Sequence, residues 1–141
     1  MNITCTRRLE WDAGHRVTLH ESKCRNVHGH RYAAEITVHA PDLDECGRVI
    51  DFGSVKALVG TWIDDHLDHG YIYKHDDAWG KSIGDGGLKV FEMPKDLGEP
   101  TAENIAALLA MVCDQLLPEP MVAKHIRIYE TPNCWADWHR S

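Results

Sequence analysis

Apolar and polar residues alternate in segments at both ends of the chain, and this alternation restricts the possible folds more than any other feature. A period of two is typical of strands that bury one face of a sheet. The pattern occurs over residues 2–11, 30–40, 124–130 and 134–139. We therefore expect two half-buried antiparallel strands near the start of the chain and two near its end.

Two segments between these strands space their apolar residues as a helix does. In residues 54–67 the apolar stripe consists of Val55, Leu58, Val59, Trp62 and Ile63. A second stripe follows Thr101, a predicted N-cap, and ends before Pro118. Each helix should pack one face on the sheet, which predicts an α+β fold with the element order β-β-α-α-β-β.

The segment between the two predicted helices, residues 71–100, is rich in Gly, Asp and Lys. We expect a long loop there, and such a loop inside a compact domain is usually functional or mobile. The chain shows no internal repeat and no low-complexity tract, so residues 1–141 are predicted to form a single domain.

Charge and cysteine content narrow the class of function. The 22 acidic and 15 basic residues give a net charge of −7, which disfavours nonspecific binding to nucleic acid or anionic membranes and favours a small-molecule substrate. No apolar run reaches the roughly 18 residues of a membrane span, and a secretion signal is not evident, so we expect a cytoplasmic protein. The five cysteines form no C-x-x-C pair, which argues against a disulfide framework or a cysteine-only zinc site.

The stretch Cys24-Arg-Asn-Val-His28-Gly-His30 offers a candidate metal site. His28 and His30 share the parity of the strand that follows, so their side chains should project to one side, about 7 Å apart along the backbone. His15 lies at the end of the first strand, which an antiparallel partner would bring beside them. Three protein ligands and one open position are typical of catalytic zinc. Three imidazoles favour zinc, although nickel, copper and iron also accept them.

Two further places carry reactive side chains. Cys24 could be a fourth metal ligand, a base or a buried apolar residue, and the neighbouring Lys23 and Arg25 favour a reactive thiolate. Asp68 precedes His69 just after the first predicted helix, where a carboxylate could orient an imidazole for proton transfer.

The motifs W-D-A-G-H, C-x-x-x-H-G-H, L-D-H, P-T-A-E-N and Y-E-T occur in this order along the chain. With them the sequence resembles the 6-pyruvoyltetrahydropterin and 6-carboxytetrahydropterin synthase family over nearly its whole length. The three residues between Cys24 and His28 are similar to the 6-carboxytetrahydropterin synthases, because the animal pyruvoyl-forming enzymes have a longer spacing there. The resemblance implies a tunnelling fold (T-fold), in which a four-stranded antiparallel sheet carries two helices on one face. Barrels close by homo-oligomerisation, commonly as hexamers, with active sites between subunits.

The resemblance also implies a role for each candidate residue. The implied metal ligands for Zn²⁺ are His15, His28 and His30, the catalytic residues Cys24, Asp68 and His69, and the substrate-binding residues Thr101, Glu103 and Glu130. Within the third group, Glu130 would anchor the pterin ring. The implied reaction converts 7,8-dihydroneopterin triphosphate to 6-carboxy-5,6,7,8-tetrahydropterin, acetaldehyde and triphosphate, in the synthesis of queuosine or another 7-deazaguanine.

Three other interpretations have some support in the sequence. A 6-pyruvoyltetrahydropterin synthase would only eliminate triphosphate from the same substrate. A non-catalytic, zinc-bearing pterin-binding protein would have no need of Cys24, Asp68 and His69. A cupin would explain the H-x-H-x4-E pattern that ends at Glu35, but Asp42 stands where that motif expects glycine, and two helical stripes fit an all-β barrel poorly.

Overall fold

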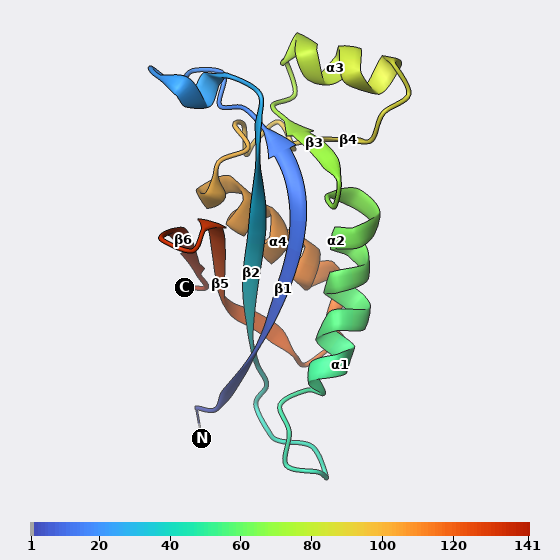
Figure 1. The fold of residues 1–141 in the computed structure, drawn as a ribbon. Helices are drawn as coiled ribbons and strands as arrows, with labels where there is room; N and C mark the ends of the chain where they lie inside the picture. Colours follow the sequence, from blue (N-terminus) through green and yellow to red (C-terminus); the bar gives the residue numbers. More distant parts are fainter. Residues whose placement is uncertain (1) are drawn as a thin grey trace.

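The structure, a computed structural model, describes residues 2–141 and contains one six-stranded sheet in the order β4-β3-β1-β2-β5-β6 (Figure 1). The strands are β1 (Thr4–His15), β2 (His28–His39), β3 (Gly70–Tyr73), β4 (Val90–Glu92), β5 (Val122–Thr131) and β6 (Cys134–His139). The helical segments are η1 (Lys23–Arg25), α1 (Phe52–Val55), η2 (Lys56–Gly60), α2 (Thr61–His66), α3 (Ala78–Asp85) and α4 (Ala102–Leu116). No helix within residues 2–141 is long and apolar enough to cross a membrane.

The first two strands pair antiparallel along their whole length, from Thr4 opposite His39 to His15 opposite His28. Both strands extend further at this end than the alternation predicted. The candidate metal ligands His15 and His28 are therefore themselves strand residues. The pairing therefore sets the relative positions of His15 and His28 through the backbone ladder.

Helices cover one face of the sheet, and a single apolar core fills the space between them (Figure 1). The predicted stripes are confirmed: Val55, Val59 and Ile63 are buried in the continuous helical run α1–η2–α2, and α4 buries most of its apolar residues in the same core. The predicted alternation failed at Ile3, which is 40% exposed because it precedes β1.

Residues 71–100 are not the predicted loop, and the sheet is not the expected four-stranded antiparallel one. The segment contains most of β3, all of α3 and all of β4, and β3 pairs parallel with both β1 and β4. Aromatic and β-branched residues favour strands, and all four residues of β3 are buried. The apolar stretch that forms β3 is only four residues long and is followed by a sequence rich in Gly, Asp and Lys, so the strand was not recognised from the sequence.

The contact between α3 and β3 gives a test of this inserted segment. Alanine normally stabilises a helix by about 1 kcal/mol over glycine, but a Cβ at Gly80 would overlap the ring of Tyr73. We expect Gly80→Ala to lower the free energy of unfolding by roughly 1–3 kcal/mol, the usual cost of overpacking. Urea unfolding would measure it, with the exposed Ser82→Ala in the same helix as control. A stabilised Gly80→Ala protein would contradict this packing.

Candidate active site

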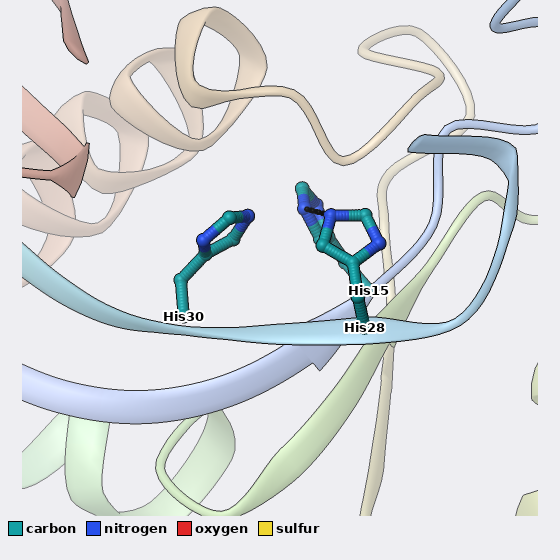
Figure 2. Close-up of side chains that lie close together, drawn as sticks. All are labelled: His15, His28 and His30. Atoms are coloured by element: carbon teal, nitrogen blue, oxygen red, sulfur yellow. Dashed lines mark hydrogen bonds between the residues drawn. The ribbon is translucent and has the colours of Figure 1, made fainter. Parts of the chain in front are cut away.

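Three histidine rings converge at one end of the β1–β2 pair (Figure 2). His15 lies directly opposite His28, and His30 follows two residues later in β2. Residues opposite each other in antiparallel strands, and residues two apart in one strand, project to the same face. Here that is the face covered by helices, since His15 is only 1% exposed. One ligand atom from each ring lies within 4.8 Å of the others, close enough for a single metal ion.

Backbone carbonyls fix the tautomers of two of these rings. The Nδ1 atom of His15 lies 2.8 Å from the carbonyl oxygen of Pro100, and that of His28 lies 2.7 Å from the carbonyl oxygen of Asn26. A carbonyl only accepts hydrogen bonds, so Nδ1 carries the proton and Nε2 keeps its lone pair. The two Nε2 atoms face each other at 3.1 Å. Lone pairs at this distance repel each other unless a cation lies between them, so the arrangement fits a metal ion bound through Nε2.

The pKa shifts of His15 and His30 also favour metal binding. Burial lowers the pKa of His15 to about 4, and burial also lowers the pKa of His30 against the opposing effect of Glu130. Both rings are therefore neutral near pH 7. Neutral imidazole is the form that binds a metal ion.

Buried polar atoms without a partner gather beside the three rings. Within residues 2–141 they include Nε2 of His30, the hydroxyl of Tyr32 and Nε1 of Trp11. Tyr32 and Trp11 are opposite each other and stacked, with ring centres 5.2 Å apart. Each unsatisfied buried group costs about 1–3 kcal/mol, and such groups often mark functional sites. Their position next to the histidines is consistent with a binding site there.

Glu130 reaches the histidine cluster from β5. Its Oε2 atom lies 3.7 Å from Nε2 of His30, and its side chain is 28% exposed. Glu130 has the same parity along β5 as the buried Ile126 and Ile128, which agrees with this contact. The carboxylate is thus free to accept hydrogen bonds from a small molecule that lies against the three histidines.

The other two candidate substrate residues lie at the start of α4. Thr101 caps the helix, since its Oγ1 accepts a hydrogen bond from the backbone N–H of Asn104 at 3.2 Å. It directly follows Pro100, whose carbonyl holds His15. Glu103 is exposed in the first turn of α4. Thr101 is therefore adjacent to the site through the chain, whereas the described contacts do not link Glu103 to the histidines.

Cys24 lies in η1, within the connection between His15 and His28, and is half-buried. The backbone N–H of Val17 donates to the Cys24 carbonyl at 2.9 Å, which closes the connection into a narrow loop. Cys24 does not belong to the group of potential metal ligands formed by the three histidines among the described residues. Cys24 therefore belongs to the loop that joins two of the candidate ligands, His15 and His28.

Asp68 and His69 form a hydrogen-bonded pair just after α2, with 2.8 Å between Oδ2 and Nδ1. Partial burial would raise the pKa of Asp68, but hydrogen bonds from His69 and from the backbone N–H of Asp12 outweigh it and lower that pKa. The Asp68 carboxylate is therefore ionised and orients the imidazole. His69 has a φ of 59°, which is unfavourable for a residue with a side chain, and its N–H donates to the Asp12 carbonyl at 2.6 Å. The strained turn presents a ring that is 75% exposed.

The structure does not bring this pair together with the three histidines. The ligand atoms of the pair group with Asp12 and not with the three rings, and His69 lines a cleft of about 460 Å³ with Asp12, Arg31 and part of His30. Asp12 and Arg31 are opposite each other in the β1–β2 ladder, in the pair next to Ala13 and His30. Neighbouring residues of a strand project to opposite faces, so the side chains of Asp12 and Arg31 in this cleft project to the face that the helices leave open. Sequence reasoning missed Asp12 and Arg31, although Asp12 belongs to the W-D-A-G-H motif.

A second group of potential ligands occurs on β5 and β6. The ligand atoms of His125, Asp137 and His139 also lie within 4.8 Å of one another. The Arg127 guanidinium already binds both Asp137 oxygens, at 2.7 and 3.3 Å. A cation would have to approach against that positive charge, so the first cluster is the better metal site.

Comparisons with known proteins agree with the geometry. The family model described as 6-pyruvoyl tetrahydropterin synthase matches residues 4–141. The chain belongs to this family. A protein named 6-carboxy-5,6,7,8-tetrahydropterin synthase from Rickettsia conorii is 42% identical over 142 residues, covering 96% of this chain and 99% of the relative. A protein named probable 6-carboxy-5,6,7,8-tetrahydropterin synthase from Halobacterium salinarum is 32% identical, with 94% and 83% covered.

Solved structures share the fold. An uncharacterized protein from Wolinella succinogenes superposes with a TM-score of 0.81 at 19% identity, over 100% of this chain and 99% of that one. The 6-pyruvoyl tetrahydropterin synthase of Caenorhabditis elegans superposes with a TM-score of 0.72 at 21% identity, over 100% and 97%. The expected α+β class is confirmed, with the six-stranded sheet described above.

Substitutions in the two histidine groups should have opposite effects on the metal content of the protein. We expect elemental analysis of the purified protein to find about one metal ion per chain, as for a single site with three protein ligands. His28→Ala and His30→Ala should each lose most of it, because each leaves two ligands. His125→Ala, from the second group, should keep it. Loss of metal only in His125→Ala would move the site to β5 and β6.

Proposed function

We propose that this chain is a metal-dependent 6-carboxy-5,6,7,8-tetrahydropterin synthase acting on 7,8-dihydroneopterin triphosphate. The observation that carries the proposal is the position of Glu130, whose carboxylate lies 3.7 Å from the candidate ligand His30. A pterin presents adjacent N–H donors on one ring edge, which a carboxylate can bind through two charge-assisted hydrogen bonds. A ring bound there would extend its side chain toward the three histidines. The name borne by relatives 41–42% identical to this chain supports the same substrate class.

The residues then have complementary tasks. His15, His28 and His30 would hold Zn²⁺, and a Lewis acid bound there would make the side-chain hydroxyls of the substrate easier to deprotonate. The thiolate of Cys24 removes a proton from the adjacent side-chain carbon. His69, oriented by the ionised Asp68, donates and accepts protons as the side chain rearranges and its carbon–carbon bond breaks. Thr101 and Glu103 complete the substrate contacts at the start of α4.

The proposed chemistry requires more than one chain, because Cys24 and His69 lie apart within a single chain. Within one chain, Cys24 lies in the connection between two metal ligands, whereas His69 belongs to the cleft on the opposite face. We propose that copies of the chain assemble into a homo-oligomer that closes a barrel, in the simplest case a hexamer, in which His69 of one copy faces Cys24 of another. Each site then lies between subunits, and residues 1–141 act as one domain within that assembly.

A 6-pyruvoyltetrahydropterin synthase is the second candidate, because the same ligands and base would serve simple elimination of triphosphate. The three-residue gap between Cys24 and His28 favours the 6-carboxy product. The short connection ties the thiol to His28, since the Asn26 carbonyl between them holds the His28 ring. Where the base stands relative to the metal decides which carbon loses its proton first. The 6-carboxy product would supply the synthesis of queuosine or another 7-deazaguanine.

Product analysis tests the proposal directly. We expect the zinc-loaded protein to convert 7,8-dihydroneopterin triphosphate, without oxygen or added nicotinamide, into 6-carboxy-5,6,7,8-tetrahydropterin and acetaldehyde. Mass analysis of the pterin and coupled reduction of the aldehyde measure the two. Cys24→Ala should keep its metal and lose turnover by about 10²-fold or more, the usual contribution of a general base. The pyruvoyl product without acetaldehyde would select the second candidate, and a bound but unchanged substrate would refute catalysis.

Mixed oligomers test the shared site. Cys24→Ala and His69→Ala chains should each be nearly inactive alone. When they are unfolded and refolded together, roughly a quarter of the sites should pair a native Cys24 with a native His69, because random assembly of cyclic contacts gives that fraction. The refolded mixture should therefore recover up to about a quarter of the activity of the native protein, in proportion to these sites. If mixed oligomers form, as shown by differently tagged chains, but stay inactive, then both residues act within one chain.

A further inference from the structure

The segment that carries Cys24 has few apolar anchors of its own. We define the thiol loop as residues 16–27, between β1 and β2. Two of its three large apolar side chains point outward, with Leu19 80% and Val27 58% exposed, and η1 buries none of its residues. A loop without apolar packing keeps one conformation only if polar contacts hold it. The contacts that hold this loop come largely from residues 71–100, the inserted segment.

Glu99 holds the first half of the thiol loop with both carboxylate oxygens. Oε1 accepts from the hydroxyl of Thr18 at 2.8 Å, and Oε2 accepts from the backbone N–H of Leu19 at 2.9 Å. Hydrogen bonds to an ionised acceptor are about twice as strong as neutral ones. Two such bonds from one side chain fix both the position and the orientation of the loop.

Glu99 is itself fixed to the site. Its backbone carbonyl accepts from the side-chain amide of Asn104 at 2.9 Å, in the first turn of α4. The next residue is Pro100, whose carbonyl orients the metal ligand His15, and the one after is Thr101, the N-cap of α4. The carboxylate that holds the thiol loop is therefore one residue from the carbonyl that holds a metal ligand. The thiol loop and the candidate metal site are thus both attached to the same short stretch of chain, Glu99-Pro100.

Asp77 holds the other half of the thiol loop through Arg16. The Asp77 side chain is 1% exposed and binds the Arg16 guanidinium at 3.0 and 3.3 Å. The third nitrogen of Arg16 donates to the carbonyl of Arg25, the residue after Cys24, at 3.1 Å. Asp77 is held in turn by the hydroxyl of Tyr71 at 3.1 Å. A buried carboxylate with this set of donors is rigid, so it fixes Arg16 and, through Arg16, the backbone beside Cys24. Figure 1 shows the loop and α3 at the same end of the sheet.

We propose that Glu99 and Asp77 are positioning residues that hold the thiol loop from two sides and so set where the Cys24 thiol stands relative to the three histidines. The role of Cys24 as a base is taken from the proposed function. The position of its thiol is a separate property that can be measured without turnover. The proposal also gives the inserted segment a task, because both carboxylates belong to it.

The first experiment compares three variants of the zinc-loaded, full-length protein. Glu99→Ala removes both bonds to the loop. Glu99→Gln keeps both, since its oxygen can accept from Leu19 and its amide can donate to the Thr18 hydroxyl. Glu21→Ala removes an equal charge from an exposed position in the same loop and serves as control. The measurements are kcat, KM, metal content and the alkylation rate of Cys24 by iodoacetamide, followed by peptide mass analysis.

We expect Glu99→Ala to alkylate several-fold faster at Cys24 and to lose kcat by roughly tenfold or more, because small displacements of a reacting group are costly. KM, metal content and the alkylation of exposed Cys46 should stay the same. Glu99→Gln and Glu21→Ala should resemble the native protein. A folded Glu99→Ala protein with native kcat and native alkylation at Cys24 would overturn the role of Glu99. If Glu99→Ala does not fold, Thr18→Val removes one of the two bonds, and native values there would overturn it equally.

The second experiment applies the same measurements to Asp77→Asn. Asparagine is as good an N-cap as aspartate, so α3 should still begin normally, while the charge that holds Arg16 is lost. Asp76→Asn, at the exposed neighbouring position, is the control. Faster Cys24 alkylation in Asp77→Asn alone supports the proposal, and equal rates in the two variants overturn the role of Asp77. If the native protein does not turn over the pterin but Glu99→Ala still frees the thiol, the proposed function fails and the positioning stands.

Discussion

The full-length pairing of β1 with β2 is the constraint on which the site depends. The ladder continues to the last residue, so His15 stands opposite His28 without help from the loop between them. The same ladder places Trp11 opposite Tyr32 and so builds the apolar core directly beneath the histidines. A slip of one residue would turn every one of these side chains to the other face. Because the core residues of both strands would then face water, the free energy that stabilises the fold also maintains the geometry of the three histidines.

The sequence predicted what depends on a regular period. The alternation placed His28 and His30 on one face, where the structure has them, and the helical stripes identified both packed helices. The short β3 was missed because four residues carry too little pattern to outweigh the Gly- and Asp-rich sequence that follows. The acceptors for His15 and His28 could not have been found at all. They are backbone carbonyls, which every residue has, and only the folded chain shows that those of Pro100 and Asn26 are the ones in reach.

The placement of Asp68 and His69 shows a different limit of sequence reasoning. A motif says that an imidazole has a carboxylate beside it, and the structure agrees at 2.8 Å. It does not say which face of a sheet the pair will serve. His69 follows a helix on the covered side, but its N–H bond to the Asp12 carbonyl turns the chain into β3 and leaves the ring in the cleft of the open face. In the proposed enzyme, one chain would carry two halves of a site that face apart, and an assembly in which the open face of one copy meets another copy is the simplest way to join them.

The tripeptide Glu99-Pro100-Thr101 is where three requirements of the proposed enzyme meet. Glu99 binds the thiol loop, the Pro100 carbonyl fixes the tautomer of His15, and Thr101 begins α4, whose apolar face fills the core. These groups are successive residues of one chain, so they cannot move independently by more than small rotations. A change in the backbone here would disturb metal ligand, thiol and helix together. The bond from Asp77 to Arg16 also acts one residue from a candidate metal ligand, because Arg16 directly follows His15. The inserted segment thus holds the thiol loop through two carboxylates, Glu99 and Asp77, and each of them is tied through the backbone to His15 or to the carbonyl that orients it.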